Sequence, residues 1–83
     1  DLKQLRELDL NDTQVTDSGL ALLAALPTLE RLRLARTRIT DAGFNEHLVP
    51  RPGLVELDLR GTQVTKEAIS AWRAAKPGRR ALR

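Results

Sequence analysis

Residues 5–20 read LRELDLNDTQVTDSGL, and the pattern returns at residues 29–44 as LERLRLARTRITDAGF and at residues 54–69 as LVELDLRGTQVTKEAI. The first two copies are 24 residues apart and the last two are 25 apart. Self-similarity at a period of about 20–50 residues is typical of repeat architectures. The chain is therefore predicted to stack similar units side by side, each burying its apolar face against the next.

Each copy begins with a short strand that has one buried face. Leu8 and Leu10 alternate with polar residues, and this period of two is typical of a half-buried strand. Thr13 follows where the chain must turn, and its hydroxyl can satisfy a backbone group inside the bend. Thr16 or Asp17 then offers the N-cap of a helix, because either side chain can accept hydrogen bonds from the first free N–H groups.

The second half of each copy is predicted to be helical. In the first copy, Leu20, Leu23 and Leu26 lie at helical spacing on one face, and Pro27 ends the helix. Such units placed side by side predict a parallel sheet with helices on its opposite side, joined by right-handed crossovers. The extra residue of the second copy is expected in the loop at residues 49–53, VPRPG.

This repeat pattern resembles that of the leucine-rich-repeat family, whose core is L-x-x-L-x-L-x-x-(N/C/T)-x-L. The continuation Val/Ile-Thr-Asp-x-Gly-Leu is similar to the cysteine-containing subclass, with Thr13, Thr37 and Thr62 in the cysteine's place, and the period resembles that of bacterial repeats. The resemblance covers about residues 2–83. It implies an α/β right-handed solenoid with a short parallel sheet on the concave side and helices on the convex side. It also implies a concave face of the kind that commonly binds proteins, without indicating which protein.

The whole chain is predicted to be one leucine-rich-repeat domain. This domain consists of three repeats and a C-terminal cap. The last helix, at about residues 66–75, is more polar than the others, which suits a cap. A strand-like segment at residues 80–82 closes it. The predicted bounds are 1–83 for the domain, about 5–28, 29–53 and 54–78 for the repeats, and 66–83 for the cap.

The N-terminal end is predicted to be open. Leu2 and Leu5 align with Leu26 and Leu29, so the sequence begins inside the repeat pattern, and we expect it to be a fragment of a longer repeat protein. The open face should expose Leu2, Leu5 and Leu20, an apolar patch of the kind that marks an interface. We expect this face to pack on a preceding repeat or to self-associate.

Composition narrows the class of protein further. The 83 residues contain no cysteine, which excludes a disulfide scaffold. No apolar run approaches the ~18 residues of a membrane span, so no membrane partner is expected. The compartment is left open, with the cytoplasm slightly favoured. The net charge of +3 is uneven, because residues 1–65 carry −2 and residues 66–83 carry +5. The basic residues of that last segment are Lys66, Arg73, Lys76, Arg79, Arg80 and Arg83.

The candidate binding residues are the strand side chains that should point away from the core. Stacking should place Glu7, Arg31 and Glu56 in one row and Asp9, Arg33 and Asp58 in another, about 4.8 Å apart. These rows have two possible roles. As charge ladders they would keep the face soluble and the strands in register, with each opposite-charge pair stabilising the sheet by about 0.2–1 kcal/mol. Otherwise they form a surface that gives specificity for a partner. The full set is Glu7, Asp9, Asn11, Arg31, Arg33, Ala35, Glu56, Asp58 and Arg60.

No catalytic, cofactor or metal site is predicted. His47 lies beside Glu46 with no nucleophile placed for it, and general acid–base work needs a partner and a pocket. Asp12 fits no metal-loop spacing, and Asp17 and Asp41 are accounted for by helix capping. Gly19 and Gly43 are single glycines, not a phosphate-binding loop, and are expected to let helix pack closely on sheet.

The sequence thus predicts a non-catalytic protein-interaction or scaffolding module that binds a protein through its strand face. Two alternatives stay open: a structural C-terminal cap of a longer solenoid, and a recruiting arm of an enzyme assembly, such as a ubiquitin ligase or kinase, with its catalytic part elsewhere. Nucleic acid is not an expected partner, because Phe44 and Trp72 occupy core-facing positions and cannot stack on bases.

Overall fold

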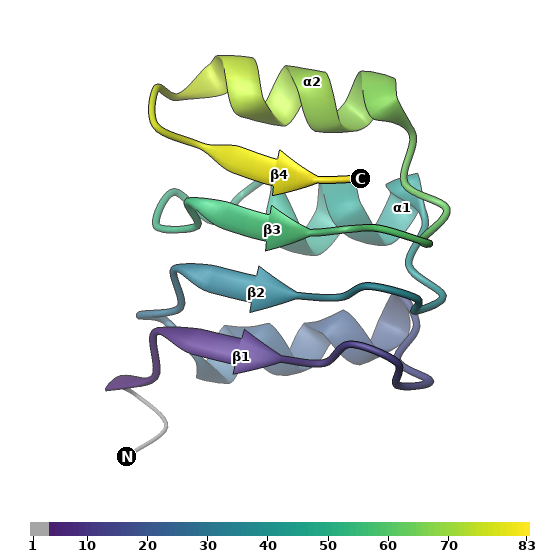
Figure 1. The fold of residues 1–83 in the computed structure, drawn as a ribbon. Helices are drawn as coiled ribbons and strands as arrows, with labels where there is room; N and C mark the ends of the chain where they lie inside the picture. The colour runs from purple at the N-terminus through teal and green to yellow at the C-terminus, as the bar shows by residue number, and fades with distance from the viewer. Residues whose placement is uncertain (1–3) are drawn as a thin grey trace.

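The computed structural model describes residues 4–83, in which four short strands form one parallel sheet in the order β1-β2-β3-β4 (Figure 1). Three successive leucines and one alanine form its central row, with Leu8, Leu32, Leu57 and Ala81 in register. The strand-like segment predicted at residues 80–82 is confirmed as the fourth strand. The strands are β1 (Glu7–Asp9), β2 (Arg31–Arg33), β3 (Glu56–Asp58) and β4 (Arg80–Leu82).

The helical segments differ in type from one repeat to the next. Figure 1 shows the segments that precede β2 and β3 lying behind the sheet. The first is a 3-10 helix because its buried leucines recur every third residue, and only three residues per turn keep such a series on one face. The segments are η2 (Ser18–Ala25, 3-10), α1 (Asp41–Gly43) continuing into η3 (Phe44–Leu48, π), and α2 (Lys66–Ala75, α).

The extra residue of the second repeat lies in η3. The N–H of Val49 donates to the carbonyl of Phe44 at 3.0 Å, the five-residue span of a π turn. Beyond that turn the two repeats match again. The backbone N–H of Arg51 donates to the carbonyl of Leu48, just as the N–H of Leu26 donates to the carbonyl of Leu23 at the equivalent positions of the first repeat. The prediction that the loop at residues 49–53 absorbs the insertion is therefore wrong. A wider helical turn takes it up and leaves the loop register unchanged.

The core runs continuously through the stack, between the sheet and the helical segments. Phe44 and Trp72 are buried, as predicted. The expected exposure of Leu20 is wrong, because Leu20 is 0% exposed and packs in the same cluster as the leucines of the following repeats. Leu5 is partly buried, and Leu2 lies outside the described residues.

Each of the first three strands ends in a threonine turn of one design. The hydroxyl of Thr37 donates to the carbonyl three residues earlier and is itself buried. This confirms the prediction that the threonine hydroxyl satisfies a backbone group inside the bend. The three bonds are Thr13 to Leu10 at 2.8 Å, Thr37 to Leu34 at 2.7 Å and Thr62 to Leu59 at 2.7 Å.

The Thr-Asp pair that follows each of the first two turns joins neighbouring repeats. Both oxygens of Asp17 accept from Thr40 of the next repeat, Oδ1 from its N–H at 2.8 Å and Oδ2 from its hydroxyl at 2.5 Å. Asp41 binds Thr65 in the same way, with both distances 2.8 Å. The threonines are the N-caps, because Thr40 accepts from the N–H of Ala42. The prediction that the aspartates cap their own helices is wrong, and we call each Asp–Thr pair an inter-repeat brace.

Gly43 makes room for the first brace. A Cβ on Gly43 would lie 2.5 Å from Asp17 Cγ, whereas a Cβ on Gly19 would meet only Val15 of its own repeat, at 2.8 Å. The close approach predicted for these glycines is real, but it is to side chains rather than to the sheet. Burial raises the pKa of Asp17, and hydrogen bonds from Thr40 and the Gly43 N–H outweigh it, so the net pKa is lowered.

Candidate functional site

The outward face of the sheet carries two rows of side chains in the register that the sequence predicted. Glu7 lies opposite Arg31, and Arg31 opposite Glu56. Asp9, Arg33 and Asp58 form the second row. The fourth strand adds Arg80 to the first row and Leu82 to the second. These two were missed, although both lie 24 residues beyond their row neighbours, so the repeat period could have identified them.

The predicted residues are not equally available on this face. Ala35 is fully buried, which overturns its place among the outward-facing residues. The strand ends two residues before it, so the alternation of the strand no longer fixes its direction, and its N–H donates to Asn11 Oδ1 at 2.7 Å. Asn11 and Glu56 are partly buried, and Asp58 is only 6% exposed. The exposed members are Glu7, Asp9, Arg31, Arg33 and Arg60.

Asp58 is held by a residue of its own repeat. Two nitrogens of the Arg60 guanidinium donate to its carboxylate, Nε at 2.9 Å and Nη2 at 2.7 Å. These hydrogen bonds lower the pKa of Asp58 more than its burial raises it, and they raise the pKa of Arg60. Bidentate pairs of this kind are among the strongest charged contacts. The pairing therefore removes Asp58 from its row neighbour Arg33.

Two arginines of β2 share one carboxylate. Arg33 Nη2 lies 3.3 Å from Glu7 Oε2, and Arg31 Nε lies 3.8 Å from Glu7 Oε1. The carboxylate of Asp9 accepts from the backbone N–H of Asn11 at 2.9 Å. Arg31 and Arg33, with side chains 44% and 48% exposed, are therefore incompletely neutralised. We call them the β2 arginine pair.

The charge ladder is thus real in register but uneven in contact. Glu56 pairs with Arg80 of β4, at 2.9 Å, rather than with Arg31. A shallow hollow of about 180 Å³ lies at the middle of the face. Its lining combines the β2 arginine pair with the apolar end of β4. The hollow is bounded by Arg31, Leu32, Arg33, Glu56, Leu57, Asp58, Arg60 and Leu82.

A further ion pair lies just beyond the strands. Asp12 and Arg36 occupy the same position in successive repeats and both have left-handed backbones, with φ of 61° and 59°. The guanidinium of Arg36 donates to both carboxylate oxygens of Asp12, which lowers the pKa of Asp12 and raises that of Arg36. Gly61 fills this position in the third repeat, with φ of 73°. The pair extends the charged face toward the turns.

Away from this face, His47 lies half-buried on η3 with Nε2 3.4 Å from Glu46 Oε2. In residues 4–83 no three His, Cys, Asp or Glu side chains gather into a group that could hold a metal ion. No helix in that part of the chain is long and apolar enough to cross a membrane.

Comparison with known families agrees with the repeat pattern. Residues 3–24 and 25–43 match the family model described as Leucine Rich repeat. A comparison with curated proteins finds no match. The chain therefore contains leucine-rich repeats, and β3 continues the register of the two matched repeats into residues 56–58.

Proposed function

We propose that this chain is a non-catalytic protein-interaction module that binds a protein through the outward face of its sheet. Leucine-rich repeats generally act by binding other proteins, and stacked repeats offer an extended surface for this. The observation that carries the proposal is the β2 arginine pair, two exposed guanidiniums that share the single carboxylate of Glu7.

The chemistry of the pair indicates what the partner presents. Guanidinium groups bind carboxylates through two parallel hydrogen bonds, and rigid strands fix where those donors lie. Asp58 and Asp9 are already engaged with Arg60 and the backbone. The partner therefore supplies an acidic side chain to Arg31 or Arg33. Leu82, which is 52% exposed, supplies an apolar contact beside them.

The test is site-specific photo-crosslinking on the face, combined with charge reversal. A photoreactive residue at Asp9, an exposed position of β1 in the same row as Arg33, should crosslink one dominant protein, identified by mass spectrometry. Arg33→Glu should reduce that crosslink by about tenfold, the effect of losing one charged hydrogen bond. Arg73→Glu, an equal charge change on exposed α2, is the control. An equal loss in both variants would contradict binding through the sheet.

We also retain the finer description of the architecture as a proposal. It comprises right-handed crossovers, a concave sheet with convex helices, repeats at about 5–28, 29–53 and 54–78, and bacterial repeats of the cysteine-containing style. Support comes from the strong preference of parallel strands for right-handed connections. It also comes from the threonines that replace the cysteine and bond the i−3 carbonyls.

A second candidate, a structural cap of a longer solenoid, has one observation in its favour. Asp17 and Asp41 form the braces, but the third repeat has Lys66 at that position. An ammonium group cannot accept the two hydrogen bonds that a following threonine would donate. The third repeat is therefore unsuited to brace another. The recruiting arm of an enzyme assembly stays a hypothesis.

A further inference from the structure

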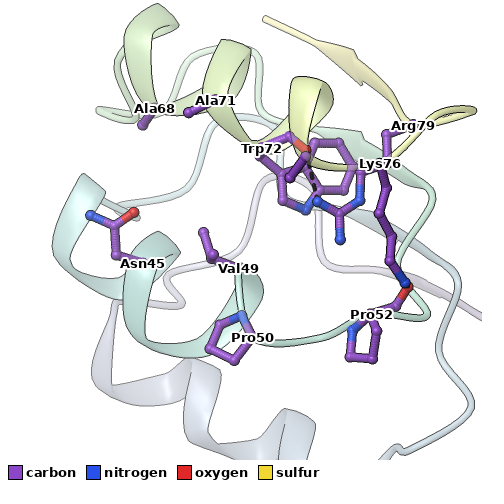
Figure 2. Close-up of a pocket in the computed structure, with 10 residues that line it drawn as sticks. Asn45, Val49, Pro50, Pro52, Ala68, Ala71, Trp72, Lys76 and Arg79 are labelled. Atoms are coloured by element: carbon purple, nitrogen blue, oxygen red, sulfur yellow. Dashed lines mark hydrogen bonds between the residues drawn. The ribbon is translucent and has the colours of Figure 1, made fainter.

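A groove separates the helical segments of the second and third repeats (Figure 2). It has a volume of about 430 Å³, within the range of ligand-binding pockets, about 300–1,000 Å³. Its walls come from η3, the loop after it, and α2. The lining is mostly apolar, with two cations at one end. The lining residues are Asn45, Val49, Pro50, Pro52, Ala68, Ala71, Trp72, Ala75, Lys76 and Arg79.

Arg79 replaces a core leucine. Equivalent backbone hydrogen bonds show which positions of the repeats correspond. In each, an N–H donates to a carbonyl of the preceding repeat: Glu30 to Arg6, Val55 to Glu30 and Arg80 to Val55. The residue before each donor is Leu29, Leu54 and Arg79, respectively. Leu29 and Leu54 are buried, and Arg79 is 8% exposed. The sequence identified Arg79 only as one of six basic residues in the C-terminal segment, and its burial distinguishes it from the exposed ones.

The buried guanidinium is only partly satisfied. Its Nη1 donates to the carbonyl of Trp72 at 2.7 Å, and its Cζ lies 4.6 Å from the centre of the Trp72 ring. Its Nε and the Trp72 Nε1 are buried without partners. Among residues 4–83 no carboxylate lies within ion-pair distance of Arg79. A helix carbonyl carries only a partial charge, so this cation lacks a full counter-charge, which is costly in a buried site.

The surroundings of Arg79 define the rest of the ligand. Val49 is 41% exposed and Ala71 is also exposed, so apolar surface borders the cation. Figure 2 shows Val49, Pro50 and Pro52 facing the Trp72 and Arg79 side chains across the groove. Lys76 adds a second cation and donates to the Pro52 carbonyl at 3.3 Å. A suitable ligand has aliphatic groups for the walls and an anion for Arg79.

We infer that this groove binds a peptide segment of a partner protein in which an acidic side chain stands beside aliphatic side chains. The groove runs between two helical segments, the setting in which amphipathic peptides dock by their apolar side. The last 18 residues hold six cations and one acid, so the local field attracts an acidic segment. This surface is built from the helical side of the repeats, and the inference does not depend on binding through the sheet.

The experiment uses the single tryptophan of the chain, which lies in the groove. Two pools of acetylated, amidated helical peptides would be titrated while Trp72 fluorescence is recorded. Both pools carry Leu, Ile or Val at i, i+3 and i+4. One has Glu at the flanking positions and the other has Gln there. The Glu pool should give a saturable change, about tenfold tighter than the Gln pool, as expected for one charge-assisted hydrogen bond.

Two variants locate the effect. Arg79→Leu restores the leucine of the preceding repeats and should abolish the preference for Glu. Ala71→Glu changes an exposed wall residue and should weaken binding of the Glu pool without altering the fold measured by circular dichroism. Ser70→Glu, on exposed α2 outside the lining, is the matched control.

The proposal is overturned if neither pool gives a saturable signal, if both bind equally, or if Arg79→Leu keeps the preference for Glu. Octanoate is titrated in parallel. If octanoate saturates the Trp72 signal and the peptides do not, the groove takes a small apolar anion and the peptide assignment is wrong.

Discussion

At the scale of single residues, Asp17 connects two repeats through a contact that spans 23 residues. Asp17→Asn keeps the shape but leaves one accepting oxygen for the two donors of Thr40, so that its amide N–H₂ faces the other donor. We expect a loss of about 1–2 kcal/mol, because a buried or half-buried hydrogen-bonding group left unsatisfied costs that much. Asp12→Asn, in an exposed ion pair, should cost less than Asp17→Asn, because exposed ion pairs contribute little to stability. Urea unfolding measures both, and equal costs would contradict the brace.

The same residue predicts a dependence on pH. The folded-state pKa of Asp17 lies below its ordinary value of 3.8. A depressed carboxyl pKa stabilises the fold above the unfolded pKa, and that stability is lost as pH falls through the folded pKa. The difference in unfolding free energy between the wild type and Asp17→Asn should therefore be constant near pH 7 and shrink below about pH 4. A difference that grows on acidification would reverse the assigned sign.

Gly43 tests the space that the brace needs. On helix propensity alone, Gly43→Ala should stabilise the chain by about 0.8–1 kcal/mol. The added methyl would instead displace the Asp17 carboxylate, so we expect a lower urea midpoint. Gly53→Ala, whose Cβ would meet nothing closer than 3.8 Å, is the control and should change little. A stabilised Gly43→Ala would show that Asp17 is not held there.

The braces also show what the sequence could predict at this scale. The sequence offered Thr16 or Asp17 as the N-cap of the first helix, whereas the structure shows no side-chain cap bond from Asp17 to η2, and it is Thr40 that caps the helix of the next repeat. The partner of Asp17 was wrong because capping rules count residues along one helix. The two donors that Asp17 accepts from, the N–H and the hydroxyl of Thr40, come close to it only when two repeats stack. Ala35 was misplaced for a related reason, since the alternation of a strand loses meaning where the strand ends.

At the scale of elements, the repeat period predicted the strands closely and the helices only in part. Strand register follows from alternation, which tolerates no slip. The helices accommodate one residue more or fewer by changing their turn, as the 3-10 helix η2 and the π turn η3 do. The sequence alone showed a spacing of 25 in place of 24 but not which element absorbs it.

Deleting Asn45 tests this element-level account. The deletion removes an exposed residue of η3 and should convert its π turn into a tighter turn, closer to that of η2. Deleting Gly53 should cost more, because it shifts the loop hydrogen bonds that match between repeats. Urea midpoints rank the two variants. If the Gly53 deletion is the milder one, the extra residue belongs to the loop after all.

At the scale of the whole molecule, the sheet has ends of opposite charge. The first row begins with Glu7 on β1 and finishes with Arg80 on β4, and among the described residues each of these strands has a partner on one side only. A second copy placed with its β1 against β4 would continue the row with Glu7 beside Arg80. Such head-to-tail contacts leave a free end on each added copy, so they produce open chains or larger rings rather than two-fold dimers.

We therefore predict weak self-association driven by the opposite charges at the two ends of the sheet. An apolar contact through Leu20, which the sequence suggested, is not available because Leu20 is buried. Sedimentation velocity at low salt should show a mean mass that rises with concentration without a plateau at the dimer, and salt should suppress it. Glu7→Arg and Arg80→Glu should each abolish the rise, because each places like charges at the contact. Mixing the two variants should restore the rise, because every contact between unlike variants again sets an acidic side chain against a basic one. A monomer at all concentrations, or a plateau at the dimer for the wild type, would exclude the head-to-tail contact and leave the charged ends free for other partners.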